Sequence, residues 1–158
     1  MKRQLVFIPV GPDELGVMSG DPAIVQRTAY TVTDELVAEL GYEAKDAEDA
    51  EYAALVLASV AALCSYGART VVVAEVDPAL VSGGVDPVNG QIVLASCPVG
   101  AITSWFADEP GADVADAAAI SRGLTIDQAW DQPAVQALLN SHDLLWNDVV
   151  EYRRGEEG

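Results

Sequence analysis

The sequence predicts one α+β domain of two layers, in which a mixed sheet of about four strands is packed by four or five helices. Two observations indicate this class. Short runs rich in Val and Ile alternate with capped helical stretches, and strands and helices follow one another in a mixed order. With 158 residues, 51% of them hydrophobic and 21% charged, the chain is large and apolar enough to bury one core. We expect that domain to cover residues 1–152 and a flexible tail to follow at 153–158.

The first forty residues predict a strand, a short helical segment, a β-prone run and a helix. QLVFIPV, residues 4–10, is an apolar run that ends at a Gly-Pro turn, as a buried strand does. Residues 13–20 have room for one or two helical turns, and RTAYTVT, residues 27–33, is β-prone. Thr33 then caps a helix over residues 34–40, whose first turn is acidic and which a Gly ends.

The middle of the chain predicts the central helix and the central strand. Residues 46–66 form a helix with an acidic first turn and a Gly stop at 67. Its second half is apolar all round, so we expect burial on most faces. RTVVVAEVD, residues 69–77, reads as a strand that is buried on both sides.

Two further strands follow a long loop. Residues 77–90 are rich in Pro, Gly, Asp and Asn and predict a loop. QIVLASCPV, residues 91–99, is the next strand. AITSWFADE, residues 101–109, follows so closely that we consider it a candidate partner of that strand.

The last third predicts helices. DVADAAAIS, residues 113–121, is a short Ala-rich helix. Thr125 caps the segment 126–140, in which Pro133 marks either a kink or the start of a new helix. SHDLLWNDVVEYR, residues 141–153, is the terminal segment discussed next.

We expect that terminal segment to be a helix that closes the fold. Ser141 is a suitable N-cap, and Leu145, Val149 and Tyr152 would share one face at helical spacing. The alternative makes His142 a general base or a metal ligand. His142 has no second His and no Cys near it in the sequence, whereas metal sites usually need three or four ligands, so we favour a docking helix.

The charge balance argues against nucleic acid as a direct partner. The chain has 25 acidic and 8 basic side chains and a net charge of −17, which repels phosphate backbones. The excess of carboxylates indicates either simple solubility or a basic protein partner. Cys64 and Cys97 lack the spacing of a disulfide framework and predict core thiols in a reducing, cytoplasmic compartment. No stretch approaches the length of a membrane span, so we predict no membrane association.

Common catalytic motifs are missing from the sequence. It contains no G-x-S-x-G elbow, no phosphate-binding G-x-x-x-x-G-K-[ST] loop and no G-x-G-x-x-G fingerprint. Gly83 and Gly84 lie in a loop without a nearby Lys and predict a turn. We therefore predict no cofactor.

One group of carboxylates predicts an alternative, a divalent cation site. Acids follow two predicted strands and lie in the loop between them, and oxygen ligands gathered at one sheet edge bind Mg²⁺ or Ca²⁺. The same acids are also ordinary turn and cap residues, and their spacing does not match an EF-hand. The candidate ligands are Glu75, Asp77, Asp86, Asp108 and Glu109.

Aromatic side chains predict a contact surface. Trp105 lies on a predicted strand and Trp130 on a polar helix. Core packing is the favoured interpretation of each because Trp buries a large area, but both need not fit in one core. An exposed Trp130 beside Asp127 and Asp131 would anchor a basic partner. Glu48 and Glu51, in the acidic turn of the central helix, are the further candidates for partner binding.

Three segments resemble a family of small uncharacterised actinobacterial proteins, a domain of unknown function. HDLLWNDVVEY is similar to its C-terminal His-acidic-Leu-Leu-Trp signature, here His142, Asp143, Leu144, Leu145 and Trp146. VFIPV, and AEDAEYAALVLASVAAL followed by RTVVVAEVD, are similar to its first strand and to its Glu-Tyr-Ala-Ala helix and Val-rich strand. The resemblance implies a shared fold and reuse of Glu51 and Tyr52, but no activity. This chain departs from the family pattern in the segment LTIDQAWDQPAVQALLN. We expect that segment to be a lineage-specific addition that covers part of the domain.

The sequence leaves two hypotheses about function. The leading hypothesis is a non-enzymatic, acidic protein-interaction module that binds an unidentified, basic protein partner. The alternative is a small-molecule or metal-dependent enzyme with a cleft near Glu75, Asp77 and Asp108. A flat apolar patch ringed by acids would favour the first, and a polar pocket that holds several of those acids would favour the second.

Overall fold

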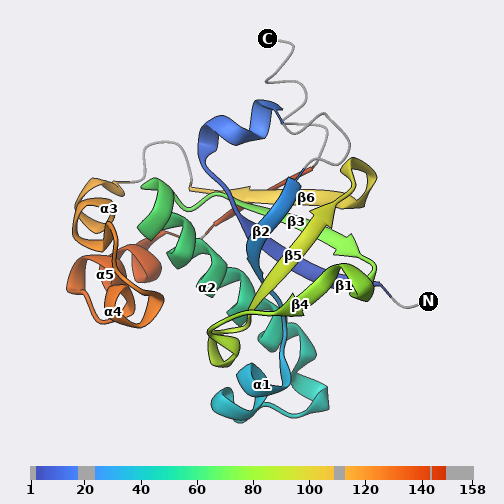
Figure 1. The fold of residues 1–158 in the computed structure, drawn as a ribbon. Coiled ribbons are helices and arrows are strands. Elements are labelled where there is room, and N and C mark those ends of the chain that lie inside the picture. Colours follow the sequence, from blue (N-terminus) through green and yellow to red (C-terminus); the bar gives the residue numbers. More distant parts are fainter. Residues whose placement is uncertain (1–2, 18–23, 109–112, 143, 149–158) are drawn as a thin grey trace.

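The computed structural model describes residues 3–17, 24–108, 113–142 and 144–148 (Figure 1). The strands are β1 (Gln4–Pro9), β2 (Ile24–Tyr30), β3 (Val71–Val76), β4 (Val81–Gly83), β5 (Gln91–Cys97), β6 (Ile102–Ala107) and β7 (Leu145–Asp148). The α-helices are α1 (Asp34–Leu40), α2 (Ala47–Tyr66), α3 (Ala115–Ser121), α4 (Ile126–Trp130) and α5 (Pro133–Ser141). Short 3-10 helices are η1 (Pro12–Val17), η2 (Ala44–Asp46), η3 (Pro78–Leu80), η4 (Pro87–Asn89) and η5 (Val99–Ala101).

The described strands form one sheet in the order β4-β5-β2-β1-β3-β6-β7, and every neighbouring pair is antiparallel. The predicted α+β class is confirmed, with five α-helices. The prediction of a mixed sheet of about four strands was wrong, because the sheet is fully antiparallel and has seven strands. The strand β4 lies inside the segment that we predicted to be a loop, and it is only three residues long, too short for an apolar pattern.

The central strands are buried on both faces, as their composition predicts. In β3, Val71 and Val73 contact the cluster that contains α2, while Val72, Ala74 and Val76 belong to a second cluster on the opposite face. This division follows from the alternation of side chains along a strand. The sheet therefore separates two apolar cores.

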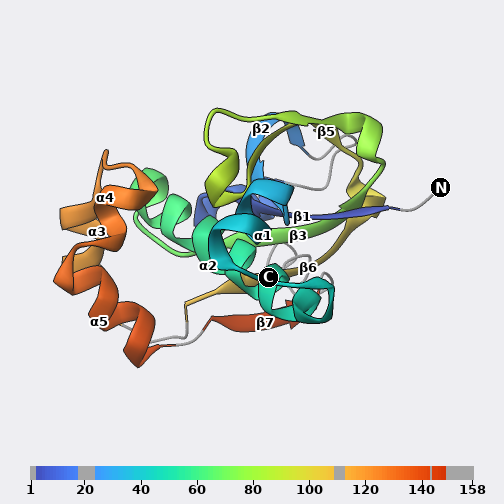
Figure 2. The same cartoon turned by 90° about the horizontal axis from the view of Figure 1, so that it is seen from below.

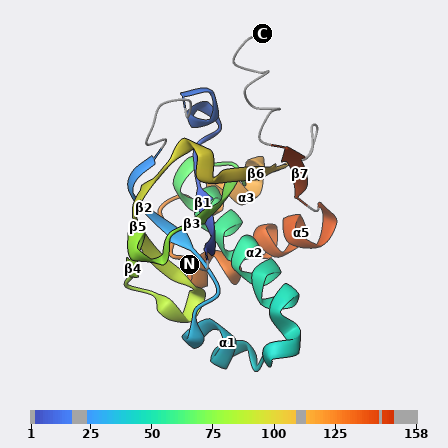
Figure 3. The ribbon, with the colours of Figure 1, turned by 90° about the vertical axis from the view of Figure 1, so that its right-hand side faces the viewer.

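One face of the sheet is covered by α2. Figure 3 shows strands β1 to β5 to the left of α2, and Figure 2 shows α3, α4 and α5 grouped at the left of the molecule. Ten of the twenty residues of α2 are buried, which confirms the prediction of a central helix apolar on most faces. Leu63 of α2 also packs with Val135 and Leu138 of α5 in a third cluster.

The other face of the sheet carries a core without an α-helix among the described residues. Its buried members come from β1, β2, β3, β5 and β6, with Leu80 of η3 and Ala101 of η5 at its margin. In Figure 1, β2 and β5 run obliquely across β1 and β3, as strands of a strongly twisted sheet do. The strands and their connections thus bury this face themselves.

The terminal segment does not form the predicted helix in its described residues. The helix α5 ends at Ser141, and Leu145–Asp148 forms β7, which pairs antiparallel with β6 (Figure 2). Our prediction failed because a short apolar run, here Leu144, Leu145 and Trp146, suits a strand as well as a helical turn, and pairing with the edge of β6 decides for the strand. Val149, Tyr152 and the predicted tail lie outside the described residues.

The partner of β6 also differs from the expectation. It pairs with β3 and β7, whereas β5 pairs with β2 and β4. A hairpin between β5 and β6 would need a tight turn. The chain instead passes through η5 to β6, which lies near the other edge of the sheet in the strand order. The two strands that are adjacent in sequence are therefore separated by three others.

Local signals placed the helices α1, α2, α3, α4 and α5 correctly. The Thr33 side chain accepts a hydrogen bond from the backbone of Leu36, and Gly41 ends α1 with a φ of 69°. Pro133 begins α5 rather than kinking one long helix. Both cysteines are buried, as predicted for core thiols, and burial raises the pKa of the Cys64 thiol.

Gly90 joins η4 to the sheet at a place where a side chain has no room. Its φ is +81°, and a Cβ atom there would lie 2.5 Å from the Thr31 carbonyl oxygen. The carbonyl of Gly90 also accepts a hydrogen bond from the Thr31 backbone at 2.9 Å. This close contact fixes η4 against the start of α1.

We expect Gly90→Ala to lower the free energy of unfolding by about 2 kcal/mol or more, because it adds backbone strain to a steric clash. Urea unfolding followed by circular dichroism measures the change. Gly83→Ala is the matched control, since a Cβ there meets nothing within 4 Å. Equal stability of the two variants would contradict the role given to Gly90.

The helix η1 is attached to β2 by an ion pair. Arg27 donates to both carboxylate oxygens of Glu14, at 3.1 and 2.5 Å, and Glu14 also accepts from the Gly11 backbone. The hydrogen bond from Arg27 is the main reason that the pKa of Glu14 is lowered from its ordinary value of 4.5. Glu14 is thus more acidic in the folded chain than in the unfolded one.

A group with a lowered folded pKa stabilises the fold at pH values above its unfolded pKa, and that contribution is lost as the pH falls through the folded pKa. We therefore expect Glu14→Gln to lower the free energy of unfolding by about 1 kcal/mol at neutral pH, since the pair is part-exposed. The difference from the parent protein should shrink below pH 4.5. Urea titrations across that range would refute this if the difference stayed constant.

Candidate functional site

A groove of about 450 Å³ opens between α1, α2, η4 and α4. Figure 1 shows α1 at the bottom and α4 at the left, and the groove residues Tyr52 and Val56 belong to the N-terminal half of α2. Its lining is mainly apolar: Leu40, Tyr52, Val56, Val88, Ile126 and Trp130. We refer to it as the α1–α4 groove.

The groove gathers apolar side chains that are exposed. Leu40 is 42% exposed, Tyr52 60%, Val88 41% and Trp130 38%. These are four of the ten large hydrophobic residues that are exposed in the described part of the chain. Scattered exposed apolar residues are ordinary, but a contiguous group that lines a hollow marks a contact surface. Trp130 is thus partly exposed, which is the condition that the sequence set for a contact role.

Hydrogen bonds hold the walls of the groove in place. The Thr33 hydroxyl donates to the carbonyl of Pro87 at 2.7 Å, which ties α1 to η4. The Asn89 side chain donates to Asp86 at 2.7 Å and to Asp127 at 3.1 Å, and the second bond ties η4 to α4. These bonds link α1, η4 and α4, which are three of the four elements that line the groove.

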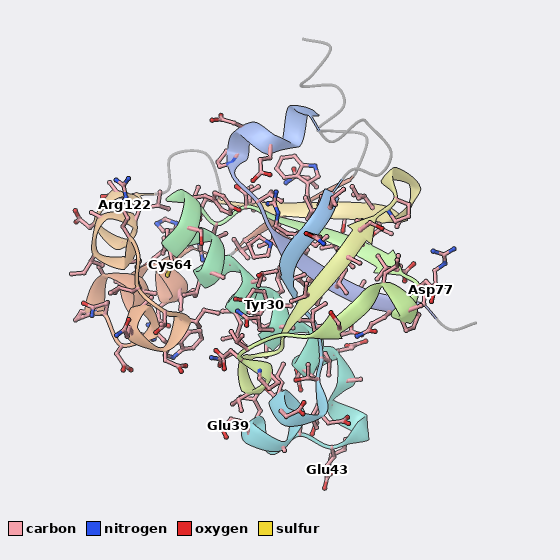
Figure 4. All side chains as sticks on the ribbon, in the orientation of Figure 1. Tyr30, Glu39, Glu43, Cys64, Asp77 and Arg122 are labelled. Atoms are coloured by element: carbon pink, nitrogen blue, oxygen red, sulfur yellow. The ribbon has the colours of Figure 1, made fainter. Side chains whose placement is uncertain are left out.

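Carboxylates surround the groove. Glu39 and Asp127 line it, and both are exposed. On α2, the exposed Glu48 lies one helical turn before Tyr52, so the two residues share a face. Figure 4 shows Glu39 and Glu43 projecting at the α1 end of the molecule. The acids Glu48, Asp49, Glu51 and Asp131 are exposed on the helices that form the groove.

Basic side chains are few at this end. Lys45 is exposed and lies 3.4 Å from Glu43, so its charge is offset locally. The rim therefore keeps a strong negative charge. Cations approaching the groove would be attracted, and anions would be repelled.

A smaller pocket of about 200 Å³ adjoins the groove and shares Tyr52, Val56 and Trp130 with it. It continues toward α5 and the start of β7, and we call it the α5 pocket. Its further lining residues are mostly polar: Ser59, Arg69, Gln136, Leu139, Asn140, His142 and Leu144.

Arg69 is the most deeply buried charge at this pocket. It is 2% exposed, and its Nε donates to Asp108 at 2.6 Å. Its backbone N–H donates to the second carboxylate oxygen at 3.0 Å, and Nη2 donates to the carbonyl of His142 at 2.9 Å. A buried charge is tolerated only when it is paired and hydrogen-bonded, and Asp108 supplies that pairing.

The proposed signature residues lie at the join between α5 and β7. His142 caps the end of α5, with its backbone N–H bonded to the carbonyl of Leu138 at 3.0 Å. Leu144 packs against the cluster that contains α2, whereas Leu145 is 43% exposed. Trp146 is in β7, and Asp143 lies outside the described residues. These placements make the segment a structural connection rather than a docking helix.

The carboxylates of the predicted cation site are not brought together. The strands β3 and β6 are antiparallel, so their C-terminal ends lie at opposite edges of the sheet. Asp77 ends β3, and Figure 4 shows it far to the right, whereas Asp108 follows β6 and is paired with Arg69. Asp86 is bonded to Asn89, and Glu109 lies outside the described residues. Across the described ranges, no three His, Cys, Asp or Glu side chains are grouped so as to hold a metal.

Sequence reasoning singled out Trp130, Glu48 and Glu51, which lie on the helices around the groove, but it did not single out other residues there. Sequence reasoning noticed Tyr52 only through the family resemblance. Tyr52 lies one helical turn after Glu48, at the acidic end of α2, and this position could have indicated that its side chain is exposed. Arg69 was read simply as the start of a strand. Trp105, considered as a contact residue, is half-buried, and it packs on the core without helices.

Comparison with known proteins identifies a family but no function. The model of a family of unknown function, DUF6912, matches residues 4–154. No curated protein and no solved structure matches the chain. Within the described residues, no helix has the length and apolar character needed to cross a bilayer. The resemblance to a family of unknown function is confirmed, while the actinobacterial origin and the signature stay predictions.

We expect Asp108→Asn to lower the free energy of unfolding by about 3 kcal/mol, because it leaves the buried Arg69 charge unpaired. Chemical denaturation measures this loss. Lys45→Gln is the control, since it removes an ion pair whose side chains are 77% and 72% exposed, and it should leave stability almost unchanged. Similar values for the two variants would show that the Arg69 pair is not a main support of the fold.

Proposed function

We propose that this protein, which belongs to the family of unknown function DUF6912, is a non-enzymatic interaction module whose α1–α4 groove binds a basic, amphipathic helix of a partner protein. The observation that carries this proposal is the coincidence of exposed apolar side chains with a rim of carboxylates. Trp130 and Tyr52 are the anchors that we assign to affinity.

The chemistry of the partner follows from the charge of the rim. Apolar anchors favour a segment with a hydrophobic stripe, and the carboxylates favour Lys or Arg on its flanks. With a net charge of −17 on the chain, an acidic segment would be repelled at long range. We place this interaction in the cytoplasm, where the two buried free thiols would stay reduced.

The shape of the groove favours a helix as the occupant. Its walls are helices α1, α2 and α4 with the turn η4, and no strand edge lines it. A bound strand would need free backbone groups on such an edge, whereas a helix needs only an apolar trough. Residues at helical spacing on the partner would then meet Leu40, Tyr52 and Trp130.

Peptide display provides the test. The probe is a library of helical peptides of about 16 residues, in which the charged flanks and the apolar stripe both vary. We expect selection on the intact protein to enrich peptides with basic flanks and Leu, Phe or Trp at helical spacing. The double variant Tyr52→Ser and Trp130→Ser should weaken their binding about tenfold or more. Raising NaCl from about 50 to about 300 mM should weaken it further.

Matched variants separate this site from general attraction of basic peptides. Ile120→Ser with Val25→Ser removes two exposed apolar residues elsewhere and should have no effect. Glu48→Lys with Glu51→Lys should weaken binding, whereas Asp113→Lys with Asp116→Lys makes the same change of charge at the start of α3 and should weaken it much less. Enrichment that is indifferent to Tyr52 and Trp130, or that selects acidic peptides, would overturn the proposal.

A further inference from the structure

We infer that the α5 pocket is a second part of the proposed binding site and takes the phenyl ring of a Phe on the partner helix. The inference rests on the proposed function, because the ring must belong to a segment that lies in the α1–α4 groove. It names one side chain of the partner, and that side chain would distinguish the partner from other basic helices.

The groove and the pocket meet along one turn of α2. Tyr52 and Val56 are four residues apart and line both hollows, whereas Ser59, about one turn further on, lines only the pocket. Ala53 and Leu57 line only the groove. Because the two hollows share a single turn of α2, one side chain of a helix in the groove is enough to enter the pocket.

The wall between the two hollows is held in place by its neighbours. Trp130 ends α4 and lines both hollows, and its carbonyl accepts a hydrogen bond from the Gln136 side chain at 2.7 Å, which ties α4 to α5. Leu139 and Leu144 line the pocket and pack against the cluster that contains α2. The pocket is therefore formed before a ligand enters it, so little ordering opposes binding.

The buried polar side chains of the pocket make no demand on an occupant. Ser59 is fully buried and its hydroxyl donates within α2, and Arg69 is paired with Asp108. Across the part of the chain that the structure describes, the buried side-chain atoms without a partner are those of Trp105 and Ser121, which do not line the pocket. An apolar group can thus enter without leaving a polar group unpaired.

Charge separates the basic residues of the partner from the residue in the pocket. Glu39 and Asp127 line the groove, whereas none of the described residues that line the pocket is a carboxylate. A Lys or Arg that entered the pocket would lose its water near the buried Arg69 charge and gain no carboxylate in return. The basic side chains therefore belong at the rim of the groove, and the pocket takes a neutral one.

Size and ring contacts select Phe among the neutral side chains. Apolar cavities of about 150 Å³ hold benzene in proteins. The pocket has a volume of about 200 Å³ and so has room for a phenyl ring. Tyr52 and Trp130 supply two aromatic rings to its lining, and a pair of aromatic rings gains more than the burial of its area alone provides. An aliphatic side chain would lack this gain.

NMR titration of the intact protein with toluene, which is the side chain of Phe, tests the pocket without a peptide. We expect saturable shifts of the Leu144 methyl signals, assigned through Leu144→Met, and smaller shifts for Leu40, which lines only the groove. Asn140 is exposed and lines the pocket, so Asn140→Phe adds a ring there and should weaken toluene binding about tenfold or more. Ser141→Phe adds the same ring at an exposed position outside the pocket lining and should change nothing. Propionamide, the side chain of Gln, should give no shift.

The peptide library supplies the second arm. We expect the enriched peptides to carry a Phe whose replacement by Ala weakens binding to the parent protein and to the Ser141→Phe variant about tenfold or more. In the Asn140→Phe variant the same replacement should weaken binding about twofold or less, because the pocket is already filled.

The two proposals fail in different ways. The inference is wrong if toluene does not shift the Leu144 signals, or if the affinity of the enriched basic peptides is the same for the parent protein and for Asn140→Phe. Either result leaves peptide binding to the groove as a separate finding. Toluene binding to the pocket without enrichment of any basic peptide overturns both proposals, because the ring would then belong to a small ligand.

Discussion

The guanidinium of Arg69 ties three distant segments together at the end of the sheet. Its contacts reach Asp108 after β6 and the carbonyl of His142 before β7, while Arg69 itself leads into β3. A charge that is 98% buried is tolerated only with such partners, so these segments must meet. The pair therefore fixes where β6 ends, where α5 gives way to β7, and where the α5 pocket has its polar wall.

A second constraint is the sheet itself, which is apolar on both faces although α2 covers only one of them. The face opposite α2 is buried by the twisted strands themselves and by the short helices η3 and η5. The α-helices lie on the same side of the sheet as α2. There, α1, η4 and α4 do not fill all the space beside α2, and the α1–α4 groove remains between them. The groove is a consequence of this one-sided arrangement of helices.

In the interaction that we propose, the charge and the groove would act on different aspects of recognition. Carboxylates on α1, α2 and α4 would raise the local concentration of a basic partner and orient it, and they would add little binding energy because salt screens exposed charges. Trp130 and Tyr52 would supply the apolar area from which affinity comes. The α5 pocket lies next to both aromatic residues, so an occupant of the pocket and an occupant of the groove would share a wall.

The sequence alone determined the features that depend on neighbouring residues. The caps at Thr33 and Gly41, the new helix at Pro133 and the doubly buried β3 follow from local hydrogen bonding, backbone freedom and apolar pattern. The acidic first turn of α2 also follows from the local sequence, whereas the exposure of Trp130 does not. Only the tertiary structure decided what depends on pairing between distant residues. The antiparallel sheet separated Asp77 from Asp108, the free edge of β6 made residues 145–148 a strand, and the burial of Arg69 created a pocket wall. Such contacts join residues far apart in the chain, and no local pattern encodes them.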